Sequence, residues 1–281
     1  MRFLVAATVA AVGLVLAGGA VAGSSYTLHP AGFGPQSYAA WKAQQGTPDD
    51  TGSANQALYF QKMASTATVA AGVAVVTGVE GLPADQLTGL SWWHREDGHC
   101  GAGAPRWNVG LQDNTTGDRY TVFLGCNAAQ HTEAGTFSGH AWCEDTQPVA
   151  DTILAQTKLP ASDFTVTGLA IVFDEGTDNP NPPPVGCAQE LGPSGFVYLD
   201  NIEVDVNGTP HCWTNASDNG NAPPTACASP TGTATSGSSL NLSVPTGVAV
   251  DPTDAALVNG LNLAAPNVPL LSWTLYPNVI Y

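Results

Sequence analysis

The sequence has few basic residues. Only seven Lys and Arg stand against 23 Asp and Glu among 281 residues, which gives a formal net charge of -16. Nucleic acids and anionic membrane surfaces are recognised through basic patches, so this balance argues against both as partners. Charged residues of both signs make up 11% of the chain, below the roughly 25% of an average globular domain.

Common signatures of enzymes are also missing. The sequence contains no H-E-x-x-H motif of zinc proteases, no G-x-S-x-G nucleophile elbow and no C-x-x-C pair. Strands do not alternate with helices in the predicted pattern, which argues against a parallel α/β sheet. A glycosidase-type pair of carboxylates could still exist among the 23 acids.

The only long apolar run is N-terminal. Residues 3–21 carry no charge, follow Met1-Arg2 and lead into Ala20-Val21-Ala22, which matches the A-x-A pattern before a signal-peptidase site. We therefore predict that residues 1–22 are a signal peptide and that the protein is secreted and extracellular. No later segment is long and apolar enough to span a bilayer, so no membrane span is expected after cleavage.

The middle of the chain has the pattern of short β-strands. Seven apolar, β-branched or aromatic runs are separated by turn residues, which is typical of an antiparallel β-sandwich. The runs are residues 57–62, 67–77, 87–95, 105–112, 119–125, 164–174 and 196–206. We predict a disulfide-stapled, jelly-roll-like β-sandwich over 56–208, an N-terminal arm over 23–55 with one short helix near 36–45, and a loop-rich C-terminal tail over 209–281 with a linker near 229–239.

Three of these runs can be aligned as consecutive antiparallel strands, namely 87–95, 105–112 and 119–125. A turn centred on Thr115–Thr116 places Trp107 opposite Leu124 and Asn108 opposite Phe123, so that the inward sets of the two strands agree. A loop centred on Cys100 would place Trp93 opposite Trp107 and Trp92 opposite Asn108.

The outward-facing set of this register is a candidate sugar platform. Two aromatic rings stand beside imidazole, guanidinium and amide groups, which suits a sugar with an apolar C–H face and a rim of hydroxyls. The candidate ligand-binding residues are Trp92, His94, Arg106, Asn108 and Phe123. The alternative is that a second layer covers this face, which would make Trp92 and Phe123 part of the core.

Export makes the six cysteines candidates for three disulfides, with fifteen possible connectivities. The register places Cys100 and Cys126 at one end of the sheet, which favours a bridge between them. A Cys212–Cys227 bridge would close a small loop in the tail, and Cys143–Cys187 is the pair that remains.

An acid interrupts an apolar row in the run 196–206. The even positions are Phe196, Tyr198, Asp200, Ile202, Val204 and Val206. A buried carboxylate needs a partner or a cation, and Ca²⁺ is the plausible extracellular ion, with Asp49 and Asp50 as further ligands. The alternative is a β-bulge that turns Asp200 towards solvent.

Three of the runs resemble secreted bacterial jelly-roll sandwiches of the carbohydrate-binding-module and galactose-binding-like type. They are Ala57-Leu58-Tyr59-Phe60, the strand with Trp92-Trp93, and Phe196-Val197-Tyr198-Leu199-Asp200-Asn201-Ile202-Glu203-Val204. Residues 99–103 and 173–176 also resemble uncharacterised secreted actinobacterial proteins. The resemblance implies a structural Ca²⁺ at Asp200 and a sheet face that binds glycan.

We therefore expect a non-catalytic protein that binds extracellular polysaccharide or cell-surface glycan. Two alternatives stay open. One is a polysaccharide hydrolase or lyase that uses loop carboxylates with His131 or His140, and the other is a cell-surface structural or adhesion protein.

Overall fold

The computed structural model describes residues 26–48, 55–101, 103–178, 187 and 195–218. No helix in these ranges combines the length and the apolar character that crossing a membrane requires. Several predicted features lie outside the described residues: the signal peptide 1–22, Asp49, Asp50, Cys227 and the linker near 229–239.

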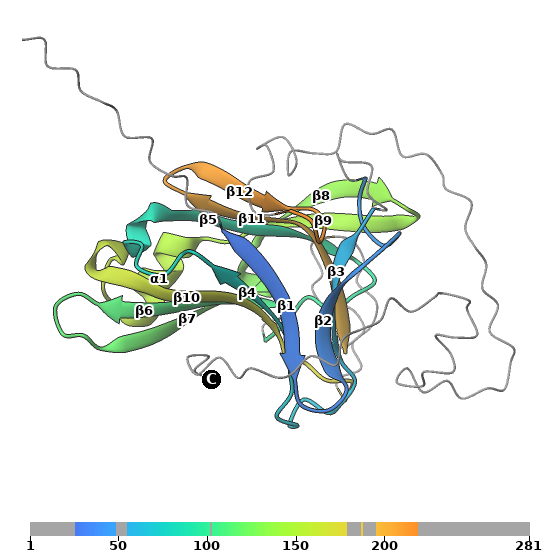
Figure 1. Cartoon of the computed structure of the whole chain (residues 1–281), viewed down its shortest axis with the longest axis horizontal. Helices are drawn as coiled ribbons and strands as arrows, with labels where there is room; N and C mark the ends of the chain where they lie inside the picture. The colour runs from blue at the N-terminus through green and yellow to red at the C-terminus, as the bar shows by residue number, and fades with distance from the viewer. Residues whose placement is uncertain (1–25, 49–54, 102, 179–186, 188–194, 219–281) are drawn as a thin grey trace, which may run out of the picture.

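The described strands form two antiparallel sheets (Figure 1), which confirms the predicted β-sandwich. The five-stranded sheet has the order β1 (Thr27–Phe33), β4 (Ala71–Thr77), β10 (Phe164–Phe173), β6 (Arg106–Asp113) and β7 (Arg119–Gly125). The second sheet runs β2 (Ser37–Lys42), β3 (Ala57–Lys62), β11 (Phe196–Val206), β5 (Leu87–Arg95), β9 (His140–Thr146) and β8 (Gln130–Phe137). A further strand of this sheet, β12 (Thr209–Trp213), pairs with β11.

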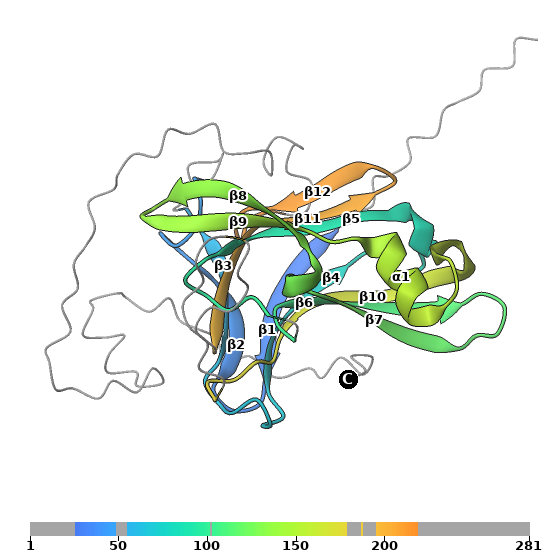
Figure 2. The same ribbon diagram turned by 180° about the vertical axis from the view of Figure 1, so that it is seen from behind.

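One α-helix and three short 3₁₀ helices connect the strands in the described ranges. Helix α1 (Val149–Thr157) contacts β7 and β5 at one end of the sandwich (Figure 2). The 3₁₀ helices are Ala84–Gln86, Cys126–Ala128 and Ala161–Asp163.

A pair of tryptophans joins the two layers at the centre of the core. The ring of Trp92 on β5 stacks on the ring of Trp107 on β6, with centroids 5.4 Å apart and planes 25° from parallel. Both side chains are fully buried. Because strand residues alternate between faces, the inward position of Trp107 turns its neighbours Arg106 and Asn108 to the outer face of the five-stranded sheet.

The predicted register is correct for one pair of strands and wrong for the other. Trp107 does lie opposite Leu124 and Asn108 opposite Phe123 in the β6–β7 pair. Strand β5, however, pairs with β11 and β9 in the other sheet and is not a neighbour of β6. The segment between β5 and β6 therefore crosses from one layer to the other instead of closing a hairpin.

Two of the three predicted disulfides are confirmed. Cys100–Cys126 links the segment after β5 to the end of β7, with Cα atoms 5.3 Å apart, and so ties the two layers together. Cys143 on β9 is bonded to Cys187, with Cα atoms 5.5 Å apart. The Cys212–Cys227 bridge stays a prediction, because Cys227 is outside the described residues.

Parts of the predicted arm and tail belong to the sheets. Strand β1 pairs with β4 and β2 pairs with β3, so residues 27–42 contribute one strand to each layer and the helix expected near 36–45 is wrong. The alternation of buried Ser37 and Ala39 with half-buried Tyr38 and Ala40 is that of a strand, because pairing with β3 overrides the helical propensity of the alanines. After position 208, β12 extends the second sheet.

A β-bulge divides β11 into two halves with opposite parity. Before it, Val197 and Leu199 face the core, and after it Ile202 and Val204 do. The pairing with β5 shifts between Asp200 and Glu203, and Asn201 has a φ of +44°, a left-handed conformation that asparagine tolerates. The first half pairs with β3 and the second with β12, so β11 has two different partner strands along the same edge.

A buried lysine fixes the end of β3 to the end of β10. The side chain of Lys62 is almost fully buried, and its ammonium group donates to the carbonyl oxygens of Thr66, Thr68 and Asp174 at 2.9, 2.9 and 2.7 Å. These three bonds use all the donors that an ammonium group has. Lys62 thereby positions the backbone at Asp174, whose carboxylate forms an ion pair with Arg106.

Replacing Lys62 by methionine keeps the length of the side chain but leaves three carbonyls without their charged donor. We expect Lys62→Met to lower the free energy of unfolding by about 3 kcal/mol or more, as measured by urea denaturation. Lys42→Met is the matched control, because the Lys42 ammonium stacks over the Tyr38 and Tyr59 rings and should cost about 1 kcal/mol or less. Equal losses in the two variants would contradict the structural role of Lys62.

Candidate functional site

A groove of about 260 Å³ lies on the outer face of the five-stranded sheet. Each of the five strands contributes at least one residue to its lining, and Asp174, the residue after β10, contributes as well. The lining residues are Phe33, Val73, Arg106, Asn108, Phe123, Val172 and Asp174.

The strand register explains why these side chains meet. Val73 on β4 lies opposite Val172 on β10, and Val172 lies opposite Arg106 on β6, so the three form one row across the sheet. The next row places Asn108 opposite Phe123 on β7. The groove therefore has an apolar half on β4 and β10 and a polar half with an aromatic ring on β6 and β7.

Arg106 is held rigidly within the groove. Its guanidinium makes a bidentate ion pair with Asp174, at 2.6 and 2.7 Å, and donates to the carbonyl oxygen of Gly103. Its Nε–H donates to Oδ1 of Asn108 at 3.0 Å, which leaves the NH₂ group of Asn108 to donate elsewhere. The guanidinium carbon lies 5.5 Å from the centre of the Phe123 ring, within the range of a cation–π contact.

Phe123 is unusual for a large apolar residue because 42% of its surface is exposed. It lies on β7, the edge strand of the five-stranded sheet. Gln156 of α1 pairs with its backbone: the Phe123 N–H donates to Gln156 Oε1 at 3.1 Å, and Gln156 Nε2 donates to the Phe123 carbonyl at 2.7 Å. The helix thus covers the open edge at this point and fixes the backbone that carries the exposed ring.

The structure brings together three of the five predicted ligand-binding residues. Arg106, Asn108 and Phe123 line the groove, whereas Trp92 and His94 are buried inside the sandwich. The prediction is wrong for these two residues because β5 belongs to the other sheet, so its even positions face the core.

The sequence reasoning missed four lining residues, Phe33, Val73, Val172 and Asp174. Val73 and Val172 lie in predicted strands but were not assigned to a site. Phe33 lies in the segment that we assigned to an arm. Asp174 ends a predicted strand beside another acid, and nothing in that pattern pointed to Arg106 as its partner.

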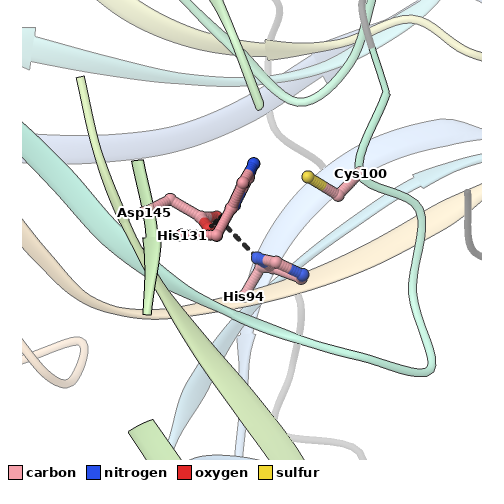
Figure 3. A group of neighbouring side chains, drawn as sticks. All are labelled: His94, Cys100, His131 and Asp145. Atoms are coloured by element: carbon pink, nitrogen blue, oxygen red, sulfur yellow. Dashed lines mark hydrogen bonds and ion pairs between the residues drawn. The ribbon is translucent and has the colours of Figure 1, made fainter. Parts of the chain in front are cut away.

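His94 belongs to a buried cluster around Asp145 (Figure 3). The Asp145 side chain is fully buried, and both of its oxygens accept hydrogen bonds. Oδ2 lies 2.5 Å from His94 Nδ1 and accepts from Trp92 Nε1–H at 2.7 Å, while Oδ1 lies 2.7 Å from His131 Nδ1. The Cys126 sulfur of the Cys100–Cys126 bridge lies 3.3 Å from Oδ2.

The register across β8, β9 and β5 creates this cluster. His131 lies opposite Asp145, and Asp145 lies opposite Trp92, so the three side chains share one face of the second sheet. Burial alone would raise the pKa of Asp145, but the charge of His94 and the hydrogen bonds from both histidines outweigh burial and hold its pKa below the usual range. The cluster therefore keeps a carboxylate ionised within the protein interior.

Asp200 has protein partners on the outer side of β11. Its Oδ2 accepts from the backbone N–H and the hydroxyl of Thr47 at 2.7 and 2.9 Å, and its Oδ1 accepts from the Asn201 N–H at 2.8 Å. A bulge is present, as one of our two alternatives required, yet Asp200 is fully buried and does not turn to solvent. Calcium at Asp200 stays a prediction, since Asp49 and Asp50 lie outside the described residues.

Two further carboxyl groups interact on β11. Burial, the interaction with Asp205 and the charge of Glu144 together raise the pKa of Glu203 to about 7. Glu203 therefore takes up its proton near neutral pH.

Trp92 should now behave as a core residue. We expect Trp92→Ala to lower the free energy of unfolding by about 3–5 kcal/mol, because it removes the ring that stacks on Trp107. Trp92→Phe keeps most of the packing but removes the donor to Asp145, so we expect a loss of about 1–3 kcal/mol. Urea denaturation measures both, with exposed Leu154→Ala as the control. A loss below about 1 kcal/mol in Trp92→Ala would show that the ring is not part of the core.

Glu203 should make the protein less stable as the pH rises through 7. Its folded pKa, raised to about 7, exceeds the ordinary value of 4.5, so the stability that it contributes is fully present below pH 4.5 and is lost as pH rises through 7. After solvent screening, we expect the free energy of unfolding to fall by about 1–2 kcal/mol between pH 5 and 8.

Denaturation of the Glu203→Gln variant checks this expectation, because the variant should lack the fall. Exposed Glu133→Gln should keep it. A fall of the same size in Glu203→Gln would assign the pH dependence to other groups.

Comparison with known proteins gives no information on the function of this chain. The resemblance to carbohydrate-binding jelly rolls therefore stays a prediction, and the function has to follow from the side chains of the groove. No known protein family, no curated protein and no solved structure matches the chain.

Proposed function

We propose that this chain is a secreted, non-catalytic protein that binds neutral extracellular carbohydrate in the groove of the five-stranded sheet. The observation that carries the proposal is the exposed ring of Phe123 beside the preorganised Arg106–Asp174 pair and the amide of Asn108. The ligand would be an extracellular polysaccharide or a cell-surface glycan.

The chemistry of the groove suits a sugar ring. One face of a pyranose is covered by C–H groups, which can pack on Phe123 and on the apolar half of the groove. The Asn108 amide can donate to a hydroxyl, and the Asp174 carboxylate can accept from one. A volume of about 260 Å³ is below the ~300–1,000 Å³ of enclosed small-molecule sites, so the groove fits one residue of a longer chain.

Charge favours a neutral ligand over an anionic one. The bidentate contact with Asp174 neutralises Arg106, the only basic residue among the described residues that line the groove. A uronate or sulfate group would therefore find no uncompensated cation there, while the net charge of -16 would repel it.

The catalytic alternative has less support. His131, one of the two histidines of this alternative, is engaged with Asp145 in the buried cluster. His140 lies on β9, with its Nδ1 3.3 Å from an Asp97 carboxylate oxygen, and the structure does not bring it together with His131. Release of reducing sugar from a polysaccharide would favour the hydrolase over a binding protein.

Phe123→Ala tests the proposal. We expect the variant to bind glycan about tenfold to hundredfold more weakly, because the exposed ring supplies about 1–3 kcal/mol of stacking and apolar contact. Affinity gels with neutral and acidic polysaccharides, followed by calorimetry on the polysaccharide that binds, measure the change. Because the ring is exposed, the free energy of unfolding should change little.

Leu154→Ala is the matched control, since it removes another exposed apolar side chain that does not line the groove. It should bind as the wild type does. Binding that survives Phe123→Ala would place the glycan elsewhere on the molecule. Binding to no polysaccharide at all would overturn the proposed function and favour the structural or adhesion role.

A further inference from the structure

We propose that His94, His131 and Asp145 form a binding site for a divalent transition metal of the zinc class. This site is independent of the groove, because it lies on the second sheet and faces the interior. One ligand atom from each of these residues and the Cys100 sulfur all lie within 4.8 Å of one another (Figure 3).

The donor set selects the class of metal. Two imidazoles and one carboxylate are typical ligands of Zn²⁺ and its neighbours, whereas Ca²⁺ and Mg²⁺ prefer oxygen ligands throughout. The Cys100 sulfur is bonded to Cys126, so it offers no thiolate. Three protein ligands leave a fourth position of a tetrahedral ion for water, as in zinc sites that are not purely structural.

The geometry is close to what such an ion requires. Both histidines direct Nδ1 at the same carboxylate, at 2.5 and 2.7 Å. Ligands of a tetrahedral ion with bonds of about 2.0–2.2 Å lie roughly 3.3 Å apart, so each Nδ1 needs to move away from the carboxylate by less than about 1 Å. Nδ1 then binds the metal without its proton, which can move to Nε2 or to solvent.

The surroundings of the cluster support metal binding in two ways. The Trp92 Nε1–H donates to Asp145 Oδ2, which is the outer hydrogen bond that commonly orients a ligating carboxylate. His131 lies on β8, the edge strand of the second sheet, and 10% of its side chain is exposed, which offers a way in for an ion. The strongly acidic chain raises the local concentration of cations.

The test is a titration of purified, tag-free protein with Zn²⁺ by calorimetry, together with the visible absorption of Co²⁺. We expect one site in the wild type and d–d bands of tetrahedral Co²⁺. His131→Gln retains a hydrogen-bonding side chain for Asp145 but removes an imidazole, so Zn²⁺ affinity should fall about 100-fold or more and the Co²⁺ bands should disappear. Circular dichroism without metal checks that this variant is folded.

His140→Gln is the matched control, because it makes the same change in a half-exposed histidine outside the cluster. It should bind Zn²⁺ and Co²⁺ as the wild type does. The proposal is overturned if the folded wild type binds neither ion, or if the two variants bind equally well. Either result would make the cluster a buried hydrogen-bond network and would leave the glycan groove untouched.

Discussion

The stack of Trp92 on Trp107 is the contact on which both candidate sites depend. It joins the two sheets at the centre of the core, and it fixes the face to which each neighbouring side chain points. Because Trp107 faces inward, Arg106 and Asn108 face the groove. Because Trp92 faces inward, its indole N–H reaches Asp145 and the next inward residue of the strand is His94. One interlayer contact therefore sets the orientation of two chemically different sites.

The sequence predicted the class of fold and the part of the site that depends on local alternation. The β6–β7 register follows from a short turn and from two inward sets that match only when Trp107 faces Leu124. The alternation of apolar and polar residues shows which positions of a strand share a face, but it does not show which strand lies beside it. The segment between β5 and β6 crosses between layers, so the in-plane pairing of Trp92 with Asn108 could not hold. Two adjacent tryptophans on β5 are both buried, Trp92 in the main core and Trp93 in an outer cluster. The sequence pattern therefore did not show which face of β5 points to the core.

The anomaly at Asp200 was visible in the sequence, but its cause was not. The even row of β11 contains an acid because that row does not stay on one face: the bulge moves the core-facing set from Val197 and Leu199 to Ile202 and Val204. Asp200 thus lies on the outer side, where Thr47 satisfies its carboxylate. Thr47 comes from a segment more than 150 positions earlier, and no local pattern links the two. The Asp145 cluster was hidden for the same reason, since its members lie on three strands.

The scarcity of basic residues affects both proposed binding sites, the groove and the Asp145 cluster. Lys62 and Arg95 are buried, Arg106 is paired with Asp174, and Lys42 lies over two tyrosine rings, so at least four of the seven basic side chains make internal contacts. The groove consequently offers hydrogen bonds and a ring without net positive charge, in line with the neutral ligand that we propose. The Asp145 cluster lacks a lysine or arginine contact in the described structure and relies on two histidines, whose Nδ1 atoms can bind either a proton or a metal. In a chain so poor in permanent cations, the positive charge that balances this buried carboxylate thus comes from the two histidines or, in the site that we propose, from a metal ion.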